Sequence, residues 1–582
     1  MTLTAFDTAG VLDLADLHVA SRIGSLTGET DETVRLAAAL AVRALRMGSV
    51  CVDLATVSGT VAILDAGELP WPEPAAWLDA CARSPMVSRD GTPGRPLRLA
   101  NGLLYLDRYW REEESIRRQL QQRATDPPAA DLTRLRADLD RLFDASSCRQ
   151  RLAAAVSTLR WVSVLAGGPG TGKTTAVARM LAVLRAQPGG PLRIALAAPT
   201  GKAAARLTEA VREAAAALPD ADRAGIIGLQ ASTLHRLLGR QPGTRTRFRH
   251  HRAHRLPYDV IVVDESSMVS LTLMARLIDA IRPDARLILV GDPGQLASVE
   301  AGAVLGDIVA APGLPEPELQ SALTSVDTAD SVITNGVVTL DRIWRFGGDL
   351  AALAAAVRRG DADAVVGLLR GGGGQLEFVE TSAVECAGLR EEVVDSLRAV
   401  AAAAAEGDAA GALRCLETHR LLCAHRRGPF GVAWWTAEVA RWLGVPEWGD
   451  AVPGRPLLIT ANDYEAGLFN GDTGVIVQSP DGLRAVFARG EELVSVSPSR
   501  LSQAQPLYAV TVHRSQGSQF ERVSLILPPA SSPLLTRELF YTAVTRAKNG
   551  LRVLGTEEAV RTAVERPIAR ASGLRESLGV PV

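Results

Sequence analysis

Lysine is almost missing from this chain. Only three of its 63 basic residues are lysine (Lys173, Lys202 and Lys548), and the other 60 are arginine. Arginine therefore serves wherever a positive charge alone is needed. The three lysines mark positions where a compact ammonium group is not replaced by a planar guanidinium. Each of them lies in a glycine- or threonine-rich segment of the phosphate-binding type.

The chain also lacks a charge excess and long apolar runs. Its 63 basic and 65 acidic residues leave a net charge of −2, so nucleic acid would have to bind at a local basic patch. No apolar run approaches the roughly 20 residues that span a bilayer, and residues 1–20 contain no lysine or arginine, so we expect no signal peptide. The six cysteines form no C-x-x-C pair, which is typical of reduced thiols and predicts a cytoplasmic protein.

The length of the chain and its hydrophobic content of 47% are sufficient for several domains. Residues 1–123 are expected to form a mainly helical domain, in which Glu112 and Glu113 belong to the solvated face of a helix. Residues 124–148 begin with a polar, proline-containing stretch and are expected to be a linker.

From Trp161 onward, short apolar segments alternate with helical ones. This order predicts an α/β fold with doubly wound parallel sheets, whose ligands bind at the carboxyl ends of the strands. The expected strands are 162–166, 192–198, 260–263 and 287–290, followed by 421–423, 457–460, 508–512 and 523–527. They would form two lobes, over 149–340 and 341–582, and period-2 alternation predicts a small β-barrel insert at about 465–505.

A glycine-rich loop joins the first strand to a helix that starts at Thr174. It reads GGPGTGKT and matches G-x-x-x-x-G-K-[ST], so its backbone N–H groups can surround a β-phosphate. We predict that Lys173 contacts the β- and γ-phosphate oxygens of ATP and that the Thr174 hydroxyl binds Mg²⁺. A turn without a ligand is the alternative, which the flanking strand and helix disfavour. The nucleotide-binding residues would be Gly167, Gly168, Pro169, Gly170, Thr171, Gly172, Lys173, Thr174 and Thr175.

Polar side chains end two further strands. Asp264 is expected to hold Mg²⁺ through water, and Glu265 to polarise the attacking water as a general base. Gln295 follows the strand at 287–290 and could respond to the γ-phosphate. Each of these residues alone is common at a strand end, so their assignment depends on the phosphate-binding loop upstream.

These segments resemble the first motifs of superfamily 1 helicases, and the resemblance continues in the second half of the chain. The matching segments are Gly167–Thr174, Ala198–Ala203, Asp264–Met268, Gly291–Leu296, Leu340–Phe346, Thr511–Ser518 and Tyr541–Lys548. Thr233–Gly239 and Asn462–Asp472 are similar to the RecD family, the α subunit of exodeoxyribonuclease V. The resemblance covers roughly residues 150–555.

The resemblance implies two RecA-like lobes that hold one ATP between them, with an SH3-like insert in the second lobe. The second lobe would bring Arg345 and Arg546 to the γ-phosphate, so that hydrolysis depends on closure of the lobes. Gln150 corresponds to the glutamine with which the family recognises adenine. The chain has Arg514 where the family usually has lysine and Gln519 where it usually has glutamate, so the roles of these two positions are open.

The same resemblance implies contacts with single-stranded or unwinding DNA. The residues that it places on the strand are Thr200, Lys202, His235, Asn462, Thr511 and His513. Residues 240–255 contain six arginines, three histidines and no acid. Within a finger at 240–256 they would contact phosphates or separate strands, and a solvated loop is the alternative.

The sequence predicts an ATP-dependent DNA helicase, and the resemblance implies 5′–3′ movement and a role as motor subunit of a RecBCD-type complex that processes DNA ends in double-strand-break repair. Its partners would be RecC-like and RecB-like subunits, with residues 1–123 docked on the RecC-like one. A non-translocating ATP-dependent DNA-binding switch and an RNA helicase of the same superfamily are the alternatives.

Two other chemistries are not expected. None of the three lysines has an acidic residue two positions before it, so a nuclease centre of the acid-x-Lys type is excluded, and the resemblance places the nuclease on a partner. Four possible metal ligands are closely spaced, but the apolar run around 421–425 predicts a buried strand, so buried thiols are the simpler explanation. These four residues are Cys415, His419, Cys423 and His425.

Overall fold

The computed structural model describes residues 2–61, 69–89, 92–241, 247–313, 316–328, 332–342, 344, 347–381, 388–447, 451–463, 465–489 and 492–579. The predicted catalytic residue Arg345 and residues 242–246 of the expected basic finger lie outside this set.

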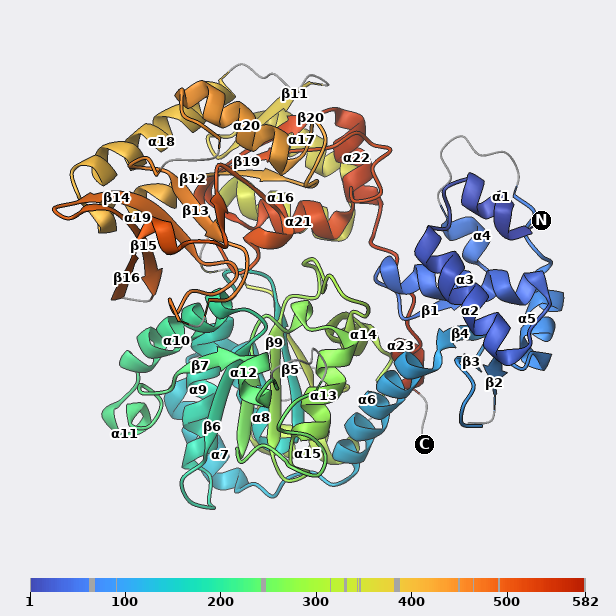
Figure 1. Ribbon diagram of the computed structural model, residues 1–582. Coiled ribbons are helices and arrows are strands. Elements are labelled where there is room, and N and C mark those ends of the chain that lie inside the picture. Colours follow the sequence, from blue (N-terminus) through green and yellow to red (C-terminus); the bar gives the residue numbers. More distant parts are fainter. Residues whose placement is uncertain are drawn as a thin grey trace.

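The first lobe is built on a parallel sheet of six strands in the order β10-β5-β9-β8-β6-β7 (Figure 1). The strands are β5 (Val162–Gly167), β6 (Ile194–Ala198), β7 (Ala231–Thr233), β8 (Val260–Val263), β9 (Arg286–Gly291) and β10 (Val337–Leu340). Its helices are α7 (Leu132–Leu142), α8 (Cys148–Leu159), α9 (Lys173–Ala186), α10 (Gly201–Ala216), α11 (Asp220–Arg223), α12 (Leu234–Leu238), α13 (Leu271–Ala280), α14 (Val304–Ala310) and α15 (Pro317–Ser325).

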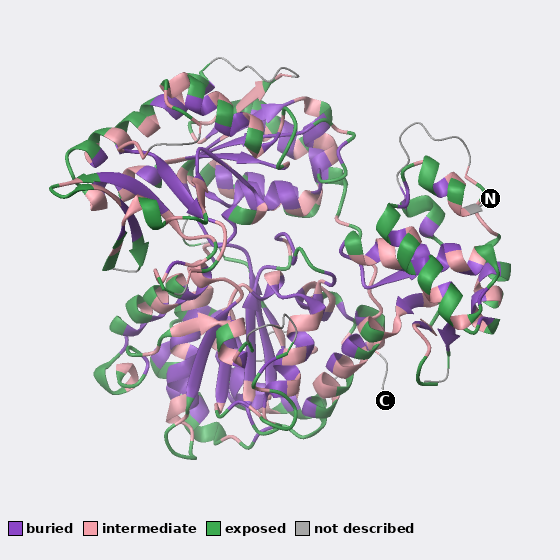
Figure 2. Ribbon diagram, viewed as in Figure 1, coloured by how far each residue is buried: buried purple, intermediate pink, exposed green. Residues whose placement is uncertain are grey.

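Alternate residues of each strand in this sheet face opposite helical layers. In β8, Val260 and Val262 belong to the core that contains α8, α9 and α10, whereas Ile261 and Val263 pack with α13. Strands that are apolar on both sides need cover on both faces, and Figure 2 shows the strands of the sheet as buried. The segment that was expected to be a linker contains α7, whose Leu135 lies in the first of these cores.

The second lobe repeats the plan with five parallel strands in the order β11-β20-β19-β12-β18. They are β11 (Leu376–Glu380), β12 (His419–Cys423), β18 (Ala509–Thr511), β19 (Phe520–Ile526) and β20 (Ala547–Gly555). Helices α16 (Gly348–Arg359), α17 (Ala362–Gly371), α21 (Arg537–Val544) and α22 (Glu557–Glu565) share one core with the sheet, and α18 (Leu389–Ala405) and α20 (Val432–Leu443) share another. Two parallel sheets with helices on both faces confirm the predicted α/β fold class.

A third, antiparallel sheet in the second lobe has the order β16-β15-β14-β13-β17. Its strands are β13 (Pro456–Ile459), β14 (Thr473–Ser479), β15 (Gly482–Arg489), β16 (Glu492–Val496) and β17 (Ala504–Pro506), and α19 (Ala409–Leu416) packs on β14. The strand expected at 457–460 was assigned to the parallel sheet, but it pairs with β14 and β17 instead. Within the described residues, the first and last strands of this order are not paired with each other.

The N-terminal part combines helices with a four-stranded sheet, β1-β4-β3-β2. Its elements are α1 (Thr2–Thr8), α2 (Leu14–Thr27), α3 (Glu32–Arg46), β1 (Cys51–Asp53), α4 (Val57–Thr60), α5 (Pro74–Arg83), β2 (Val87–Ser88), β3 (Leu97–Ala100), β4 (Leu103–Leu106) and α6 (Asp107–Thr125). None of the described helices has both the length and the apolar character needed to cross a membrane.

Helix α6 runs out of the N-terminal part along the first lobe (Figure 1). The solvated face expected there is wrong, because Glu112 and Glu113 are only 6% and 5% exposed. Glu112 accepts a hydrogen bond of 2.6 Å from the Thr272 hydroxyl of α13. Glu113 accepts one of 3.1 Å from the Ser572 hydroxyl. Both partners are remote in sequence, so local periodicity could not reveal them.

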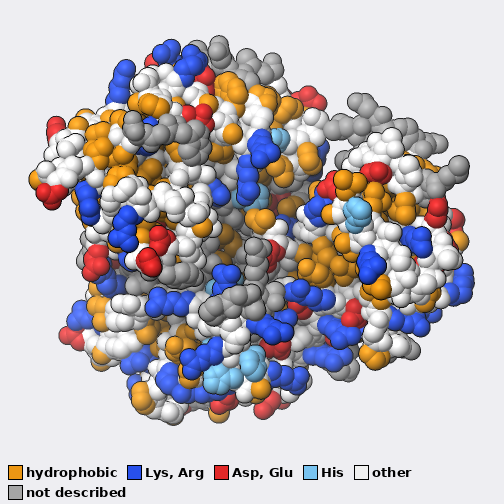
Figure 3. Space-filling view, viewed as in Figure 1, with side chains coloured by type: hydrophobic (Ala, Val, Ile, Leu, Met, Phe, Trp, Pro, Cys, Tyr) orange, Lys and Arg blue, Asp and Glu red, His pale blue; other side chains and the backbone are white. Residues whose placement is uncertain are grey.

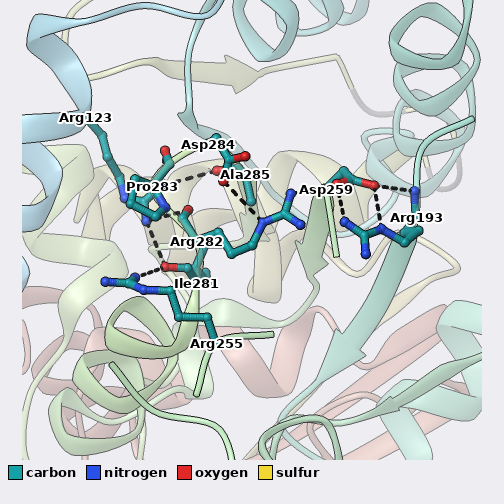
Figure 4. A network of polar contacts seen from close by, with 9 residues as sticks. All are labelled: Arg123, Arg193, Arg255, Asp259, Ile281, Arg282, Pro283, Asp284 and Ala285. Atoms are coloured by element: carbon teal, nitrogen blue, oxygen red, sulfur yellow. Dashed lines mark hydrogen bonds and ion pairs between the residues drawn. The ribbon is translucent and has the colours of Figure 1, made fainter. Parts of the chain in front are cut away.

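The end of α6 is fixed by a polar network at the amino ends of the first sheet (Figure 4). The buried Arg123 guanidinium donates four hydrogen bonds of 3.0 to 3.2 Å to backbone carbonyl groups between residues 281 and 285. Nearby, Asp259 accepts hydrogen bonds from Arg193 and Arg282. The Arg193 guanidinium beside Asp259 holds the pKa of that carboxyl well below its usual range.

After α22, residues 566–578 leave the second lobe and return to the first lobe and the N-terminal part (Figure 1). The Val50 N–H donates to the Ala571 carbonyl at 2.8 Å, and Arg570 donates to the Ser298 carbonyl at 2.6 Å. The short helix α23 (Leu574–Ser577) ends this segment between α6 and α14. We call residues 566–578 the C-terminal strap, because it joins all three parts of the chain.

Candidate functional site

A cavity of about 380 Å³ lies where the carboxyl ends of the first sheet face the second lobe. From the glycine-rich loop it is lined by Pro169, Gly170, Gly172, Lys173, Thr174 and Thr175. Asp264, Glu265 and Gln295 line it from the loops after β8 and β9, and Arg546 lines it from the second lobe. The structure therefore brings together most of the residues that the sequence assigned to the nucleotide and its hydrolysis.

The loop between β5 and α9 is held by its own polar groups. The Lys173 ammonium donates to the carbonyl oxygens of Gly167 and Gly168 at 2.7 and 3.0 Å, and the Thr171 hydroxyl donates to Gly168 at 2.8 Å. Gly172 has φ of +81°, and a Cβ there would lie 2.7 Å from Nε2 of Gln150. The backbone conformation favours glycine at this position, and a Cβ would also displace the end of the Gln150 side chain.

Trp344 lines the cavity although the sequence analysis did not assign it to the nucleotide, whereas the predicted Gln150 lies beside the glycine-rich loop and not in the lining. Gln150 is buried at the start of α8, and its Nε2 lies 3.5 Å from the Gly172 carbonyl. The backbone N–H of Trp344 donates to the Gly170 carbonyl at 2.8 Å, and the residue is 48% exposed. The Arg342 guanidinium carbon lies 3.8 Å from the centre of its ring. Trp344 stands in the quoted motif next to Arg345, which was the available signal.

The two carboxylates follow β8 on a strained backbone. Glu265 has φ of +49°, which is unusual for a residue with a side chain and is a form of strain found at functional sites. Its N–H donates to Oδ1 of Asp264 at 2.9 Å. Burial, with the charge of Glu265 beside it, raises the pKa of Asp264, and Lys173 opposes this rise. A positive ligand would relieve this crowding of negative charge.

Arg546 reaches the first lobe from the end of α21. Its side chain is buried at 2% exposure, and it donates to the carbonyl oxygens of Thr542 and Ser518, both at 3.0 Å. Its Nη2 lies 3.2 Å from Oε1 of Gln295, whose Nε2 donates in turn to Asp292 at 3.1 Å. Burial lowers the pKa of Arg546, but the guanidinium stays charged near neutral pH. Hydrogen bonds to groups of both lobes thus hold the Arg546 guanidinium in place.

The residues predicted to contact DNA come from both lobes and lie outside the lining of the nucleotide cavity. Thr200 caps α10 by accepting a hydrogen bond of 3.1 Å from Ala203 N. Burial, followed by the charge of Arg420, lowers the pKa of Lys202 to about 8. Gly201, which lies between them, is close to Phe469 of the second lobe. A Cβ built on Gly201 would be 3.4 Å from the Phe469 side chain.

The other four predicted contacts are distributed around this point. Asn462 accepts a hydrogen bond of 2.9 Å from Asn470 N in the loop that contains Phe469. Thr511 ends β18, and His513 lies in the following turn, where burial lowers its pKa. His235 lies apart on α12, with its ring 5.9 Å from that of Phe248.

The described residues of the basic finger form a folded-back segment beside α12. Arg240 and Phe248 pair as an antiparallel bridge, and the rings of His250 and His254 stack at 4.9 Å. Figure 3 shows histidine and basic side chains gathered on this face of the first lobe. Arg255 is not available to a ligand in the same way, since it is hydrogen-bonded to the Ile281 carbonyl.

The possible metal ligands of the second lobe do not form a site. Cys423 is fully buried in β12, and Nε2 of His419 lies 3.0 Å from the Ser524 hydroxyl. Within the described part of the chain, no group of three or more His, Cys, Asp or Glu side chains could hold a metal ion.

Comparison with known proteins identifies the family to which this chain belongs. The family described as RecBCD enzyme subunit RecD, N-terminal domain, matches residues 8–105, the AAA domain matches 150–301, and the UvrD-like helicase C-terminal domain matches 506–554. The chain is 51% identical over 580 residues to the RecBCD enzyme subunit RecD of Mycolicibacterium smegmatis, with 98% of each chain covered. The chain belongs to the RecD family.

More distant matches of this RecD-family chain include another helicase sequence and a solved structure. The ATP-dependent RecD2 DNA helicase of Deinococcus radiodurans is 31% identical over 414 residues, which are 69% of this chain and 48% of that protein. The crystal structure of Bacteroides Pif1 bound to ssDNA aligns with 71% of this chain and 92% of that chain, at 16% identity and a TM-score of 0.38.

Three polar residues at the cavity were not predicted for this RecD-family chain. Tyr541 lies beside the glycine-rich loop, since a Cβ on Gly168 would be 2.9 Å from its hydroxyl. Asp292 is buried beneath that loop, and burial raises its pKa. Arg206 of α10 crosses the cleft to the second lobe. The first two stand inside quoted motifs, whereas no pattern in the sequence distinguishes Arg206 from the other 59 arginines.

Proposed function

We propose that this chain is an ATP-dependent 5′–3′ DNA helicase, the motor subunit of a RecBCD-type complex that processes DNA ends in the cytoplasm. The observation that supports this most strongly is the composition of the cavity. One lobe supplies Lys173, Asp264 and Glu265, and the other supplies Arg546. A site divided between two lobes links hydrolysis to their relative movement.

Each residue of the first lobe has a definite task in the proposed reaction. Lys173 leaves the two carbonyl groups that it now contacts and binds the β- and γ-phosphate oxygens of ATP. Glu265 orients the attacking water and accepts its proton. Trp344, which lines the cavity, and Gln150, which lies beside Gly172, are assigned to the nucleotide base.

The second lobe completes the site. Arg546 stabilises the charge that develops on the transferred phosphoryl group. Its hydrogen bond to Gln295 joins the two lobes, so a change in the nucleotide alters the contact between them. We assign the same role to Arg345, which follows Trp344 in the chain.

Mg²⁺ fits the oxygen donors present in the cavity. The Thr174 hydroxyl and the Asp264 carboxylate both line it, and hard oxygen ligands are those that Mg²⁺ prefers. When bound, the ion would neutralise charge on the phosphates. The raised pKa of the Asp264 carboxyl is consistent with a group that awaits a cation.

DNA and protein partners complete the proposal. A single strand would lie across Thr200, Lys202 and Asn462 toward Thr511 and His513, with phosphate contacts that depend on salt rather than on sequence. The related subunits are named as parts of the RecBCD enzyme, so we assign RecC-like and RecB-like partners, with residues 1–123 as the docking domain.

An unwinding assay with tailed duplexes tests the proposal. We expect ATP-dependent unwinding of a DNA duplex with a 5′ single-stranded tail and little unwinding of the same duplex with a 3′ tail. Hydrolysis that is stimulated by single strands without unwinding would support a non-translocating switch. Equal stimulation by RNA and DNA strands would favour an RNA helicase.

A further inference from the structure

Arg206 connects the two lobes at the wall of the nucleotide cavity. It lies on α10, and its guanidinium donates to two acceptors in the second lobe. Nη1 donates to the Gly517 carbonyl at 3.0 Å, and Nη2 donates to Oε1 of Gln519 at 2.8 Å. All three residues line the cavity. One planar group therefore binds two points of a single segment across the cleft.

The elements joined by Arg206 each have one end at the expected DNA track and one at the nucleotide. Helix α10 starts at Thr200 and Lys202 and has Arg206 about one and a half turns later. The facing segment starts at Thr511 and ends at Gln519. Gly517 of this segment lies next to α10. A Cβ built on it would be 3.8 Å from the Cβ of Ala203, which is ordinary van der Waals contact.

We propose that Arg206 is a positioning residue that acts through Gln519 to couple the DNA-contacting segments of the two lobes to the nucleotide cavity. The proposal rests on the proposed function, because it assumes that single strands and ATP bind at these sites. DNA that draws the starts of the two segments together would close the pair, and closure at this point brings Arg546 against Gln295.

The residue types suit a contact that forms and breaks in each cycle. Arginine keeps its charge and serves two acceptors, which a lysine ammonium on a flexible stem would not do with the same geometry. Gln519 is an uncharged acceptor. A glutamate there would form a largely buried ion pair with Arg206, and breaking such a pair is more costly than breaking a hydrogen bond to an amide. Glutamine at position 519 therefore favours reopening of the cleft.

Arg206 also contributes to the electrostatics of the nucleotide cavity. Its positive charge faces the negative charges of Asp264 and Glu265, which line the same cavity. Separation of the lobes releases the Arg206 side chain from its acceptors, so its distance from Asp264 is free to change. Closure of the lobes and the electrostatics of the carboxylates are thus linked through one side chain.

A double-mutant cycle on the full chain tests this assignment. ATP hydrolysis is measured at saturating ATP while an oligo(dT) strand is titrated, for Arg206→Ala, Gln519→Ala and the double variant. We expect each single change to reduce the stimulation by DNA about tenfold, equivalent to about 1.4 kcal/mol of coupling, and the double change to reduce it no further. Arg212→Ala, an exposed arginine on the same helix outside the cavity wall, serves as the control and should keep the native stimulation.

The outcomes distinguish a coupling role of the Arg206–Gln519 contact from a merely structural role, and from failure of the proposed function. Losses that multiply in the double variant, or native stimulation in Arg206→Ala, would overturn the proposal. Gln519→Glu supplies a second readout, the release rate of a fluorescent ADP analogue. We expect slower release than in the native chain, and no such slowing when Arg206→Ala is also present. If the native chain is not stimulated by DNA, the proposed function fails, while ADP release still tests the contact between the two residues.

Discussion

The two ends of the first sheet use arginine and carboxylate in opposite ways. At the amino ends, Arg123 satisfies four carbonyl groups, and Asp259 is shared by two arginines (Figure 4). At the carboxyl ends, Lys173, Arg206 and Arg546 form no salt bridge among the described residues, although Asp264 and Glu265 line the same cavity. Charged groups whose hydrogen bonds are satisfied within the protein fix the fold, whereas charges kept apart from counter-ions remain available to a ligand.

Removal of the ammonium group at the carboxyl ends should have the largest effect. In Lys173→Ala we expect hydrolysis of ATP to be lost while the fold and partner binding are kept, because among the described residues the ammonium donates hydrogen bonds only to two backbone carbonyl groups of its own loop. Phosphate release measures hydrolysis, circular dichroism of the purified chain measures the fold, and co-purification with the partner subunits measures their binding. Native turnover in this variant would show that the glycine-rich loop does not bind the phosphates.

Arg546→Ala should reduce turnover by about 10³-fold or more, since arginines that stabilise the transferred phosphoryl group supply 10³–10⁵ in rate. Binding of a fluorescent ADP should change much less, because the arginine acts mainly in the transition state. Single-turnover hydrolysis separates the two effects. A loss of ADP affinity equal to the loss of rate would argue that Arg546 holds the lobes together rather than acting on the phosphate.

At the opposite end of the sheet, Arg123→Ala should affect stability and leave chemistry unchanged. Loss of the guanidinium leaves buried carbonyl groups without donors, so we expect the free energy of unfolding to fall by about 2–3 kcal/mol. Urea unfolding measures this change, and the Michaelis constant for ATP is the control. An altered ATP constant at native stability would break the distinction between the two ends.

The smallest expected effect is a pH dependence of DNA binding. Lys202 has a pKa lowered to about 8, so its charge is present below that pH and is lost as pH rises through it. Affinity for single-stranded DNA should be weaker at pH 9 than at pH 7, and the slope of log affinity against log salt should fall by about 0.7, the value of one phosphate contact. Lys202→Arg should show neither change, since a guanidinium stays charged at both pH values.

The parts of the fold that the sequence predicted are those set by local pattern. The strand at 260–263 has the predicted limits, because an apolar run between turn residues defines both of its ends. The glycine-rich loop and its lysine were predicted because their chemistry is contained in eight consecutive residues. Arg546 and Gln295 were placed together only through resemblance, as 251 residues separate them.

Features that depend on distant partners could not be predicted. Glu112 was assigned to a solvated face because its own helix reads as amphipathic, and its partner Thr272 is 160 residues away. Arg206 meets Gln519 across 313 residues. The strand at 456–459 satisfies the pattern of either sheet, and only its pairing with β14 and β17 decides between them.

The C-terminal strap has a consequence for how this protein is made. Ser49 and Ala571 are hydrogen-bonded although 522 residues separate them. During synthesis the N-terminal helices leave the ribosome long before the C-terminal strap is made. The contact surface around Ser49 and Val50, which we call the seam, therefore stays uncovered until the strap emerges. The seam therefore closes only after both lobes have been translated, and a chaperone that recognises apolar surface would have its longest opportunity there.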